Sequence, residues 1–463
     1  MTHQDMFGCE TSVANAEALA AWNRTVHGFL AHAAWTGETL GKALASDQRF
    51  ALGHACKGLF SLLLGRRELH AVARDAYRTA IEIDHENAVT RRERHYIEAL
   101  GAWIEGSPRR AIACMGKVLE SFPHDALAMK LDHAIRFMLG DSKGMRKALE
   151  QLTGTYRNGH VAEGYFNGCY AFTLEETGEY RLAEEHGRKA LELSPDDAWG
   201  FHAVQHVFDM TARAEEGLAW TEGKDEAWQH CNNFRYHVHW HNALLHLDLG
   251  HHDRVLSLYD TQIRQDKTDD YRDIANATSI LLRLEFDGVH VGNRWDELAN
   301  LASARTQDHC VAFADLHYMM ALCNGPDETA ATNLLSSMQS IGEKRHNDEM
   351  QAIVHQPGLL AATGLEAFRD HNFELAYNCL SKARPELQSI GGSHAQRDVF
   401  ERLAIESALR GGLTSQARGL LRERDLHRGH RDGYSQSRWA ALEGLNSTSG
   451  NTIDHVVADR HVA

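Results

Sequence analysis

A helical-hairpin repeat of about 34 residues is the feature that most constrains the fold of this chain. The clearest unit runs from Glu163 to Asp196. It predicts a first helix over Gly164–Thr177, a turn at Gly178-Glu179-Tyr180, and a second helix that ends at Ser194-Pro195-Asp196. Small residues at fixed offsets let the two helices approach closely, which is the tetratricopeptide pattern.

Weaker copies of the second helix recur along the chain, for example at Gly106 to Pro123 and at Gly250 to Ile263. The segments that precede such copies are the predicted first helices: Phe50–Leu64, Arg91–Glu105, Ala126–Leu139, Gly164–Thr177, Ala198–Arg213, Asn233–Leu249, Ala275–Glu285, Cys310–Cys323, Gly358–Asp370 and Ser393–Arg410. No segment alternates with period two, so no sheet is expected. The predicted fold class is all-α, with tetratricopeptide-like helical hairpins that form a right-handed superhelix, an α-solenoid.

Stacked repeats contact only their neighbours, which predicts one continuous domain over residues 1–445. The stretch Gly288 to Arg294 is expected to be a loop. The polar, small residues of 446–463 are expected to form a flexible C-terminal tail.

Composition narrows the possible partners and the location. A net charge of −16 argues against a nucleic-acid binder, which needs a basic face. No stretch approaches the roughly 18 apolar residues of a membrane span, so no membrane association is expected. The 8 cysteines form no Cys-x-x-Cys pair, and the N-terminus has no signal-peptide pattern. The expected location is the cytoplasm.

Histidine is unusually frequent, with 31 residues. Many of these residues fall in predicted first helices, which would line the concave side of the superhelix: His54, His95, His133, His202, His206, His237, His241, His317 and His394. An isolated histidine on such a face is most often a packed residue that bonds a backbone carbonyl, and this interpretation covers His54, His95, His133 and His317.

Two His-x-x-x-His pairs stand apart from the isolated histidines. His202 and His206 lie on one predicted first helix, and His237 and His241 lie on the next. A spacing of four puts both rings of a pair on one helix face. Neighbouring helices pack about 8–10 Å apart, so the four imidazoles can meet and hold a transition metal such as Zn or Fe. Without a metal, the same rings can act as general acid and base.

Other side chains near these pairs are assigned by their chemistry. Asp209 could orient a ligating ring through a hydrogen bond. Trp199, Trp220 and Trp240 are more typical of helix–helix packing, although Trp240 is also a candidate ligand-binding residue.

A second polar group runs from Gly391 to Asp398. Gly391-Gly392 before Ser393 indicates a flexible turn and a helix N-cap. Arg397 near a helix N-terminus is suited to a carboxylate or phosphate, so Gln396, Arg397 and Asp398 are candidate ligand-binding residues and His394 is a candidate catalytic residue. The alternative is helix capping and inter-helix salt bridges.

Several stretches resemble the tetratricopeptide repeat protein 38 family from about Asp47 to Gly412. They are Asp197-Ala198-Trp199 with His202, His206 and Met210; His237, Trp240, His241, Ala243 and Leu244; Tyr259-Asp260; and Gly391-Gly392-Ser393 with Ala395-Gln396-Arg397-Asp398. This chain has Asp209 where the family tends to have Glu, and Tyr236 and Val238 where it tends to have Cys and Asn. The resemblance implies an intracellular repeat scaffold and no agreed reaction.

Two functions remain open at this stage. The first is binding of a peptide, a protein partner or a small-molecule ligand in a His-rich concave cavity. The alternative is a metal-dependent or acid–base enzyme, in which His202, His206, His237 and His241 hold the metal or share protons and Arg397 anchors a small anionic substrate. The sequence contains no complete catalytic constellation, which favours binding.

Overall fold

The computed structural model describes residues 3–86, 89–343 and 348–447. One short strand pair lies at the N-terminus, where β1 (His3–Gln4) runs antiparallel to β2 (Glu10–Thr11). The expectation of no sheet was therefore wrong at this point. Strands of two residues are too short to show an alternating pattern in the sequence. The turn between them is held by the Asp5 carboxylate, which accepts hydrogen bonds from the Phe7 and Cys9 amides, both at 3.0 Å.

The remaining elements are helices. Those of the N-terminal half are α1 (Ala16–Leu30), α2 (Thr36–Ser46), α3 (Ala51–Leu63), α4 (Leu69–His85), α5 (Arg91–Ile104), α6 (Pro108–Ser121), α7 (Ala126–Met138), α8 (Ser142–Leu152), α9 (Glu163–Glu176), α10 (Tyr180–Leu193), α11 (Ala198–Met210), α12 (Ala214–Thr221) and η1 (Asp225–Ala227). Those of the C-terminal half are α13 (Phe234–Asp248), α14 (His252–Leu258), η2 (Tyr259–Ile263), α15 (Tyr271–Phe286), α16 (Arg294–Ser303), α17 (Ala312–Asn324), α18 (Glu328–Glu343), α19 (Glu349–Ile353), η3 (Val354–Gly358), α20 (Leu359–Arg369), α21 (Phe373–Ala383), η4 (Arg384–Ile390), α22 (His394–Arg410), α23 (Thr414–Arg428) and α24 (Gly433–Ser447).

The all-α helical-repeat fold predicted from the sequence is confirmed. The ten predicted first helices correspond to α3, α5, α7, α9, α11, α13, α15, α17, α20 and α22, and each contacts the second helix that follows it. Two boundaries were wrong. Arg294 begins α16 rather than ending a loop, and α24 continues to Ser447, so residues 446 and 447 are helical. The rest of the predicted tail, 448–463, lies outside the described residues.

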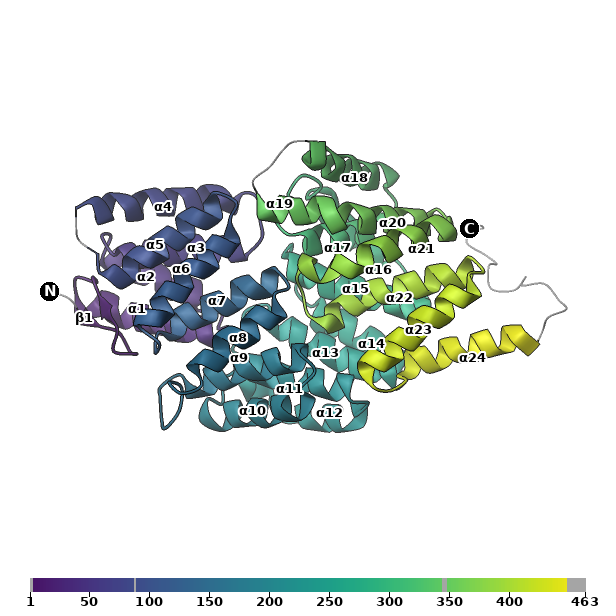
Figure 1. Ribbon diagram of the computed structural model, residues 1–463, viewed down its shortest axis with the longest axis horizontal. Coiled ribbons are helices and arrows are strands. Elements are labelled where there is room, and N and C mark those ends of the chain that lie inside the picture. Colours follow the sequence, from purple (N-terminus) through teal and green to yellow (C-terminus); the bar gives the residue numbers. More distant parts are fainter. Residues whose placement is uncertain (1–2, 87–88, 344–347, 448–463) are drawn as a thin grey trace.

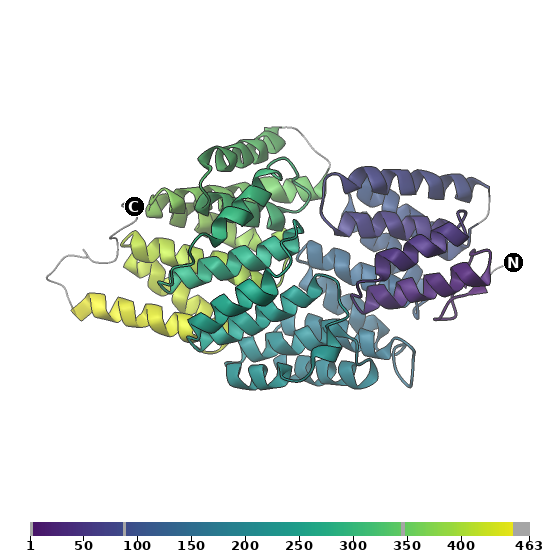
Figure 2. The ribbon, with the colours of Figure 1, turned by 180° about the vertical axis from the view of Figure 1, so that it is seen from behind.

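The array folds back on itself, which a simple solenoid would not do. Helix α22 packs against α15 as well as α21, α24 contacts α13, and α1 contacts α7. Figures 1 and 2 show the C-terminal helices lying against the middle of the chain. The first helices of the central repeats are therefore covered instead of lining an open groove.

The turn before α22 makes this closure possible. Gly391 and Gly392 have φ of +89° and +75°, a conformation that L side chains rarely adopt. A Cβ atom would lie 2.5 Å from the Met138 carbonyl oxygen at Gly391 and 2.7 Å from the Phe313 ring at Gly392. The turn expected to be flexible is instead tightly packed against α7 and α17.

Buried ion pairs join elements that are distant in the sequence. Arg92 of α5 contacts Asp5 at 3.0 Å and Asp125 at 2.6 Å, and these side chains are at most 1% exposed. The Tyr96 hydroxyl donates a hydrogen bond to Asp125 at 2.9 Å. The guanidinium thus ties the N-terminal strand turn to the start of α7.

Replacing Arg92 by Met is expected to destabilise the protein strongly. The substitution leaves two buried carboxylates without a cation, which costs about 3–5 kcal/mol in comparable cases. Urea unfolding followed by circular dichroism measures the loss. The matched control is Arg78→Met, which removes an exposed pair with Asp75 and is expected to cost at most about 0.5 kcal/mol. Equal effects of the two substitutions would contradict a structural role for the Arg92 pairs.

Candidate functional site

The four paired histidines meet at the contact between α11 and α13. Within the pairs, His206 Nε2 lies 2.9 Å from His202 Nε2, and His241 Nε2 lies 3.2 Å from His237 Nε2. Between the pairs, the ring centroids of His206 and His241 are 4.3 Å apart. One ring nitrogen from each residue falls within 4.8 Å of the others. The structure thus brings together all four rings that the sequence singled out.

The rings are enclosed rather than exposed in a groove. His202, His206 and His241 are at most 1% exposed, and His237 is partly exposed. Burial lowers the pKa of His237 to about 4 and holds the pKa values of the other three well below their usual range. All four rings are therefore neutral at pH 7. The closed array covers the rings, so they lie together inside the protein.

Two of the four outer ring nitrogens, those of His202 and His237, bond oxygen acceptors. His202 Nδ1 lies 3.3 Å from the Trp199 carbonyl oxygen, and His237 Nδ1 lies 2.9 Å from Asn276 Oδ1. His206 Nδ1 lies 3.5 Å from Glu175 Oε2 without hydrogen-bond geometry. His241 Nδ1 makes no hydrogen bond to the described residues. Acceptors at these positions favour a proton on Nδ1 and leave Nε2 bare.

Two glutamates and His394 form a second polar group beside the four rings. His394 Nε2 lies 2.7 Å from Glu175 Oε1, and His394 Nδ1 lies 3.0 Å from Glu176 Oε1. Burial alone would lower the pKa of His394, but the two carboxylates raise it to about 10. Burial raises the pKa of Glu175 to about 7, against the opposing effect of His394. His206 and His394 link the two groups, with ring centroids 5.5 Å apart.

Glu175 and Glu176 were not identified from the sequence. They are the last residues of α9, where the negative end of the helix dipole disfavours carboxylates. The sequence feature that could have identified them is the presence of two adjacent acidic residues at the end of a predicted first helix.

The residues from Gly391 to Asp398 have several distinct roles. Ser393 and Gln396 form a capping box, in which the Ser393 amide donates to Gln396 Oε1 at 3.0 Å. Arg397 donates to the Gly392 carbonyl oxygen and to Glu176 Oε2, the latter at 3.3 Å. Asp398 pairs with Arg402 at 2.6 Å and Arg424 at 2.8 Å. These contacts match the capping and salt-bridge alternative.

Other side chains noted in the sequence are engaged in packing. Trp240 is fully buried, stacks on His237 and donates a hydrogen bond to Ser279 Oγ at 3.0 Å. Asp209 pairs with Arg428 at 3.0 Å and contacts none of the paired rings. The expectation that Asp209 orients a ring was wrong, because Arg428 of α23 takes its carboxylate.

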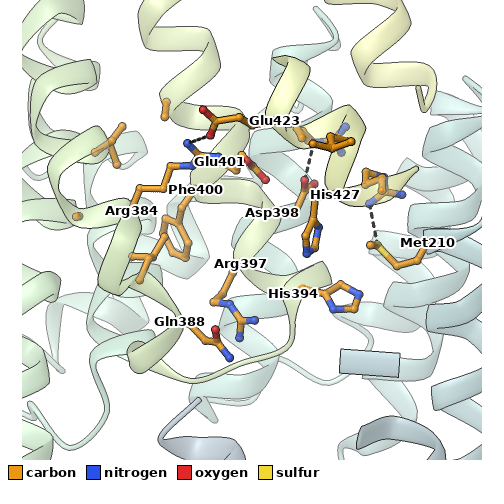
Figure 3. A pocket seen from close by; sticks show the side chains of 17 residues that line it. Met210, Arg384, Gln388, His394, Arg397, Asp398, Phe400, Glu401, Glu423 and His427 are labelled. Carbon is orange, nitrogen blue, oxygen red and sulfur yellow. Dashed lines mark hydrogen bonds and ion pairs between the residues drawn. The ribbon is translucent and has the colours of Figure 1, made fainter. Parts of the chain in front are cut away.

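A cavity of about 550 Å³ opens next to His394. Figure 3 shows His394, Arg397 and Gln388 along one side of it, and Arg384, Glu401 and Glu423 on the other. Asp398 and Met210 also line it. Since His394 lines the cavity and packs edge-on against His206, its ring lies between the cavity and the four-histidine cluster.

Comparison with known proteins adds little beyond the fold. No protein-family model matches this chain. Among solved structures it is similar to the TPR domain of P58(IPK), at 15% sequence identity and a TM-score of 0.22, over 75% of this chain and 88% of that chain. Among the described helices, none is long and apolar enough to cross a membrane. The order of helical hairpins in the chain itself therefore defines the fold.

The neutral rings generate a pH prediction for metal-free protein. Burial holds the pKa of His241 well below its usual value of 6.5, so as the pH falls below 6.5 the ring is protonated in the unfolded chain and stays neutral in the folded one. Stability contributed by the neutral ring is present above pH 6.5 and is lost as the pH falls. His241→Gln is expected to reduce the slope of unfolding free energy against pH by about 1.4 kcal/mol per pH unit between pH 6 and 5. Urea titrations in the presence of a chelator measure both slopes, and identical slopes would contradict a buried neutral ring.

Proposed function

We propose that this protein binds one late first-row transition-metal ion, such as Zn²⁺ or Fe²⁺, through His202, His206, His237 and His241. The observation that carries the proposal is the approach of the Nε2 atoms to 2.9 Å and 3.2 Å within the two pairs. A set made only of imidazoles suits Zn, Cu, Ni or Fe better than Mg or Ca.

The tautomers support a cation between the rings. In His202 and His237, the acceptors at Nδ1 hold the proton there, so the Nε2 lone pairs point inward. If the Nδ1 proton of His206 faces Glu175, its Nε2 lone pair also points inward. Lone pairs about 3 Å apart repel each other, and a metal ion that accepts all of them removes this repulsion.

The spacing of the nitrogens fits such an ion. Metal–nitrogen bonds of about 2.0–2.1 Å with angles between 90° and 109° place neighbouring ligand nitrogens about 2.9–3.4 Å apart. Both pairs fall within this range. Glu175, behind His206, matches the carboxylates that commonly orient and polarise ligating histidines.

A second candidate function is catalysis on a small anionic substrate, by metal or by acid–base chemistry. The cavity bordered by His394 and Arg397 favours it, because it places a proton-bearing ring between solvent and the carboxylates beside His206. Gln396 and Asp398 are less suited to a ligand than the sequence indicated, since both are engaged within the protein.

The wider assignment is also a proposal. The Asp197-Ala198-Trp199 stretch, the two histidine pairs and the Gly391-Gly392-Ser393 turn support membership of the tetratricopeptide repeat protein 38 family. We also propose that residues 1–445 form a single domain, that the protein is located in the cytoplasm, and that it binds peptide, protein or small-molecule partners. Helical-repeat proteins commonly present extended surfaces to such partners.

Metal content tests the central proposal. Untagged wild-type protein is expected to contain or take up about one metal ion per chain, measured by inductively coupled plasma mass spectrometry after dialysis. His206→Ala combined with His241→Ala removes two ligands and is expected to lose the metal. The control is His246→Ala combined with His251→Ala, which removes an exposed pair whose Nδ1 atoms are 3.2 Å apart. Metal-free wild-type protein that also fails to bind added Zn²⁺ or Fe²⁺ would exclude the metal site.

Glu175 is expected to increase the metal affinity of this site through its contact with His206. Glu175→Gln should weaken metal affinity by about 10- to 100-fold, as loss of such carboxylate partners does elsewhere. Glu176→Gln is the matched control, because Glu176 pairs with His394 and Arg397 and forms no ion pair with a proposed ligand. Competition titrations with a chromophoric chelator give both affinities, and equal effects of the two substitutions would show that Glu175 does not act through His206.

A further inference from the structure

Three polar side chains meet at the Trp199 ring of α11, next to the imidazole cluster. Lys130 of α7 places its Nζ 4.7 Å from the centre of the ring. His133, also of α7, packs edge-on with ring centroids 5.8 Å apart. His32, between α1 and α2, stacks on the same ring at 5.2 Å. Helix α7 and the connection between α1 and α2 thus place polar groups around one ring of α11.

Lys130 is a buried cation without a matching anion. Lys130 is 3% exposed and makes no ion pair with the described residues. Its ammonium donates a hydrogen bond to Cys169 Sγ at 3.7 Å. Burial raises the pKa of Cys169 to about 11, so the thiol is neutral and cannot compensate the ammonium. Asp197 lies near. Burial raises the pKa of its carboxyl to about 7 although the positive charge of Lys130 opposes this shift, and the two side chains form no ion pair. A buried charge of this kind is unfavourable unless something pairs with it.

The groups around Lys130 also lack partners. Neither ring nitrogen of His133 makes a hydrogen bond to the described residues, although His133 is 2% exposed. The same holds for Trp199 Nε1 and His32 Nε2. Buried polar atoms are almost always hydrogen-bonded in folded proteins. Four such atoms lie around this one ring, where a single bound group would complete their bonding.

The backbone at His32 is held in an uncommon conformation. Its φ is +56°, in the left-handed region that residues other than glycine seldom occupy. The His32 carbonyl oxygen accepts a hydrogen bond from the Asn232 amide at 2.9 Å, and Ala33 pairs with Cys231. These bonds keep the His32 ring between Trp199 and Phe234. The conformation itself belongs to the end of α1, where the residue after the C-cap is commonly left-handed and the Ala33 amide donates to the Gly28 carbonyl oxygen at 2.8 Å.

We propose that Lys130, His133, Trp199 and His32 bind the anionic head of a small molecule, a carboxylate or a phosphate. An ammonium and an indole N–H can only donate, and the imidazoles can each supply one further N–H. The complementary ligand is therefore an acceptor with negative charge. Because Trp199 packs on His202 at 4.7 Å between centroids, the ligand would lie beside the four-histidine cluster. This inference does not rest on a metal being bound there.

Isothermal titration calorimetry of the full-length protein with sodium acetate and, separately, with inorganic phosphate tests the site at constant ionic strength. Saturable binding of at least one anion is expected, and the stronger one identifies the head group. Lys130→Met should weaken it by roughly 10- to 100-fold. His133→Phe, which keeps the ring shape without its nitrogens, should also weaken it. The control Lys147→Met, on the exposed side of α8, should have no effect.

Thermal unfolding gives a second readout that does not depend on the probe. Without ligand, Lys130→Met should raise the Tm, because it removes an unpaired buried charge. A lower Tm, or no saturable binding of either anion to the wild type, would overturn the proposal. Repeating the titration with His206→Ala combined with His241→Ala separates the two sites. Anion binding is expected to persist there, so failure of the metal proposal and failure of this one give different results.

Discussion

The closure of the helical array over α11 and α13 is the constraint on which the rest of the structure depends. A tetratricopeptide-like array normally leaves its first helices facing an open groove. Here α22 packs on α15, and its N-terminal residue reaches Glu175 and Glu176 at the end of α9. Removing the central helices from water keeps the four imidazoles neutral, and neutral imidazole is the form that binds a metal.

Closure also makes the interior unusually polar for a protein core. Charges that would be solvated in an open groove must be paired, as Asp398 is with Arg402 and Arg424. His394 is similarly placed between two carboxylates. Buried polar atoms without a hydrogen-bond partner among the described residues include Trp199 Nε1, both ring nitrogens of His133 and the outer nitrogen of His241. Because buried polar atoms are usually hydrogen-bonded, a ligand or ion at these positions would complete their bonding.

The sequence predicted the repeat elements well and the closure not at all. Periodicity and small residues located all ten first helices, and a spacing of four placed each histidine pair on one face. Closure depends on contacts between residues far apart in the chain, such as Gly391 with Met138, and such contacts leave no local pattern. For the same reason Gln396 looked like a ligand residue when it caps α22, and Glu175 was missed although it lies against His206. The pairing of Lys130 and His133 with Trp199 likewise required the fold.

The metal proposal is tested most directly by anomalous diffraction from crystals of untagged protein, recorded at the absorption edge of the metal present. The predicted result is one peak between His202, His206, His237 and His241, about 2.0–2.1 Å from at least three ring nitrogens. A peak held by other residues, or no peak at these rings after soaking with Zn²⁺ and Fe²⁺, would contradict the proposal.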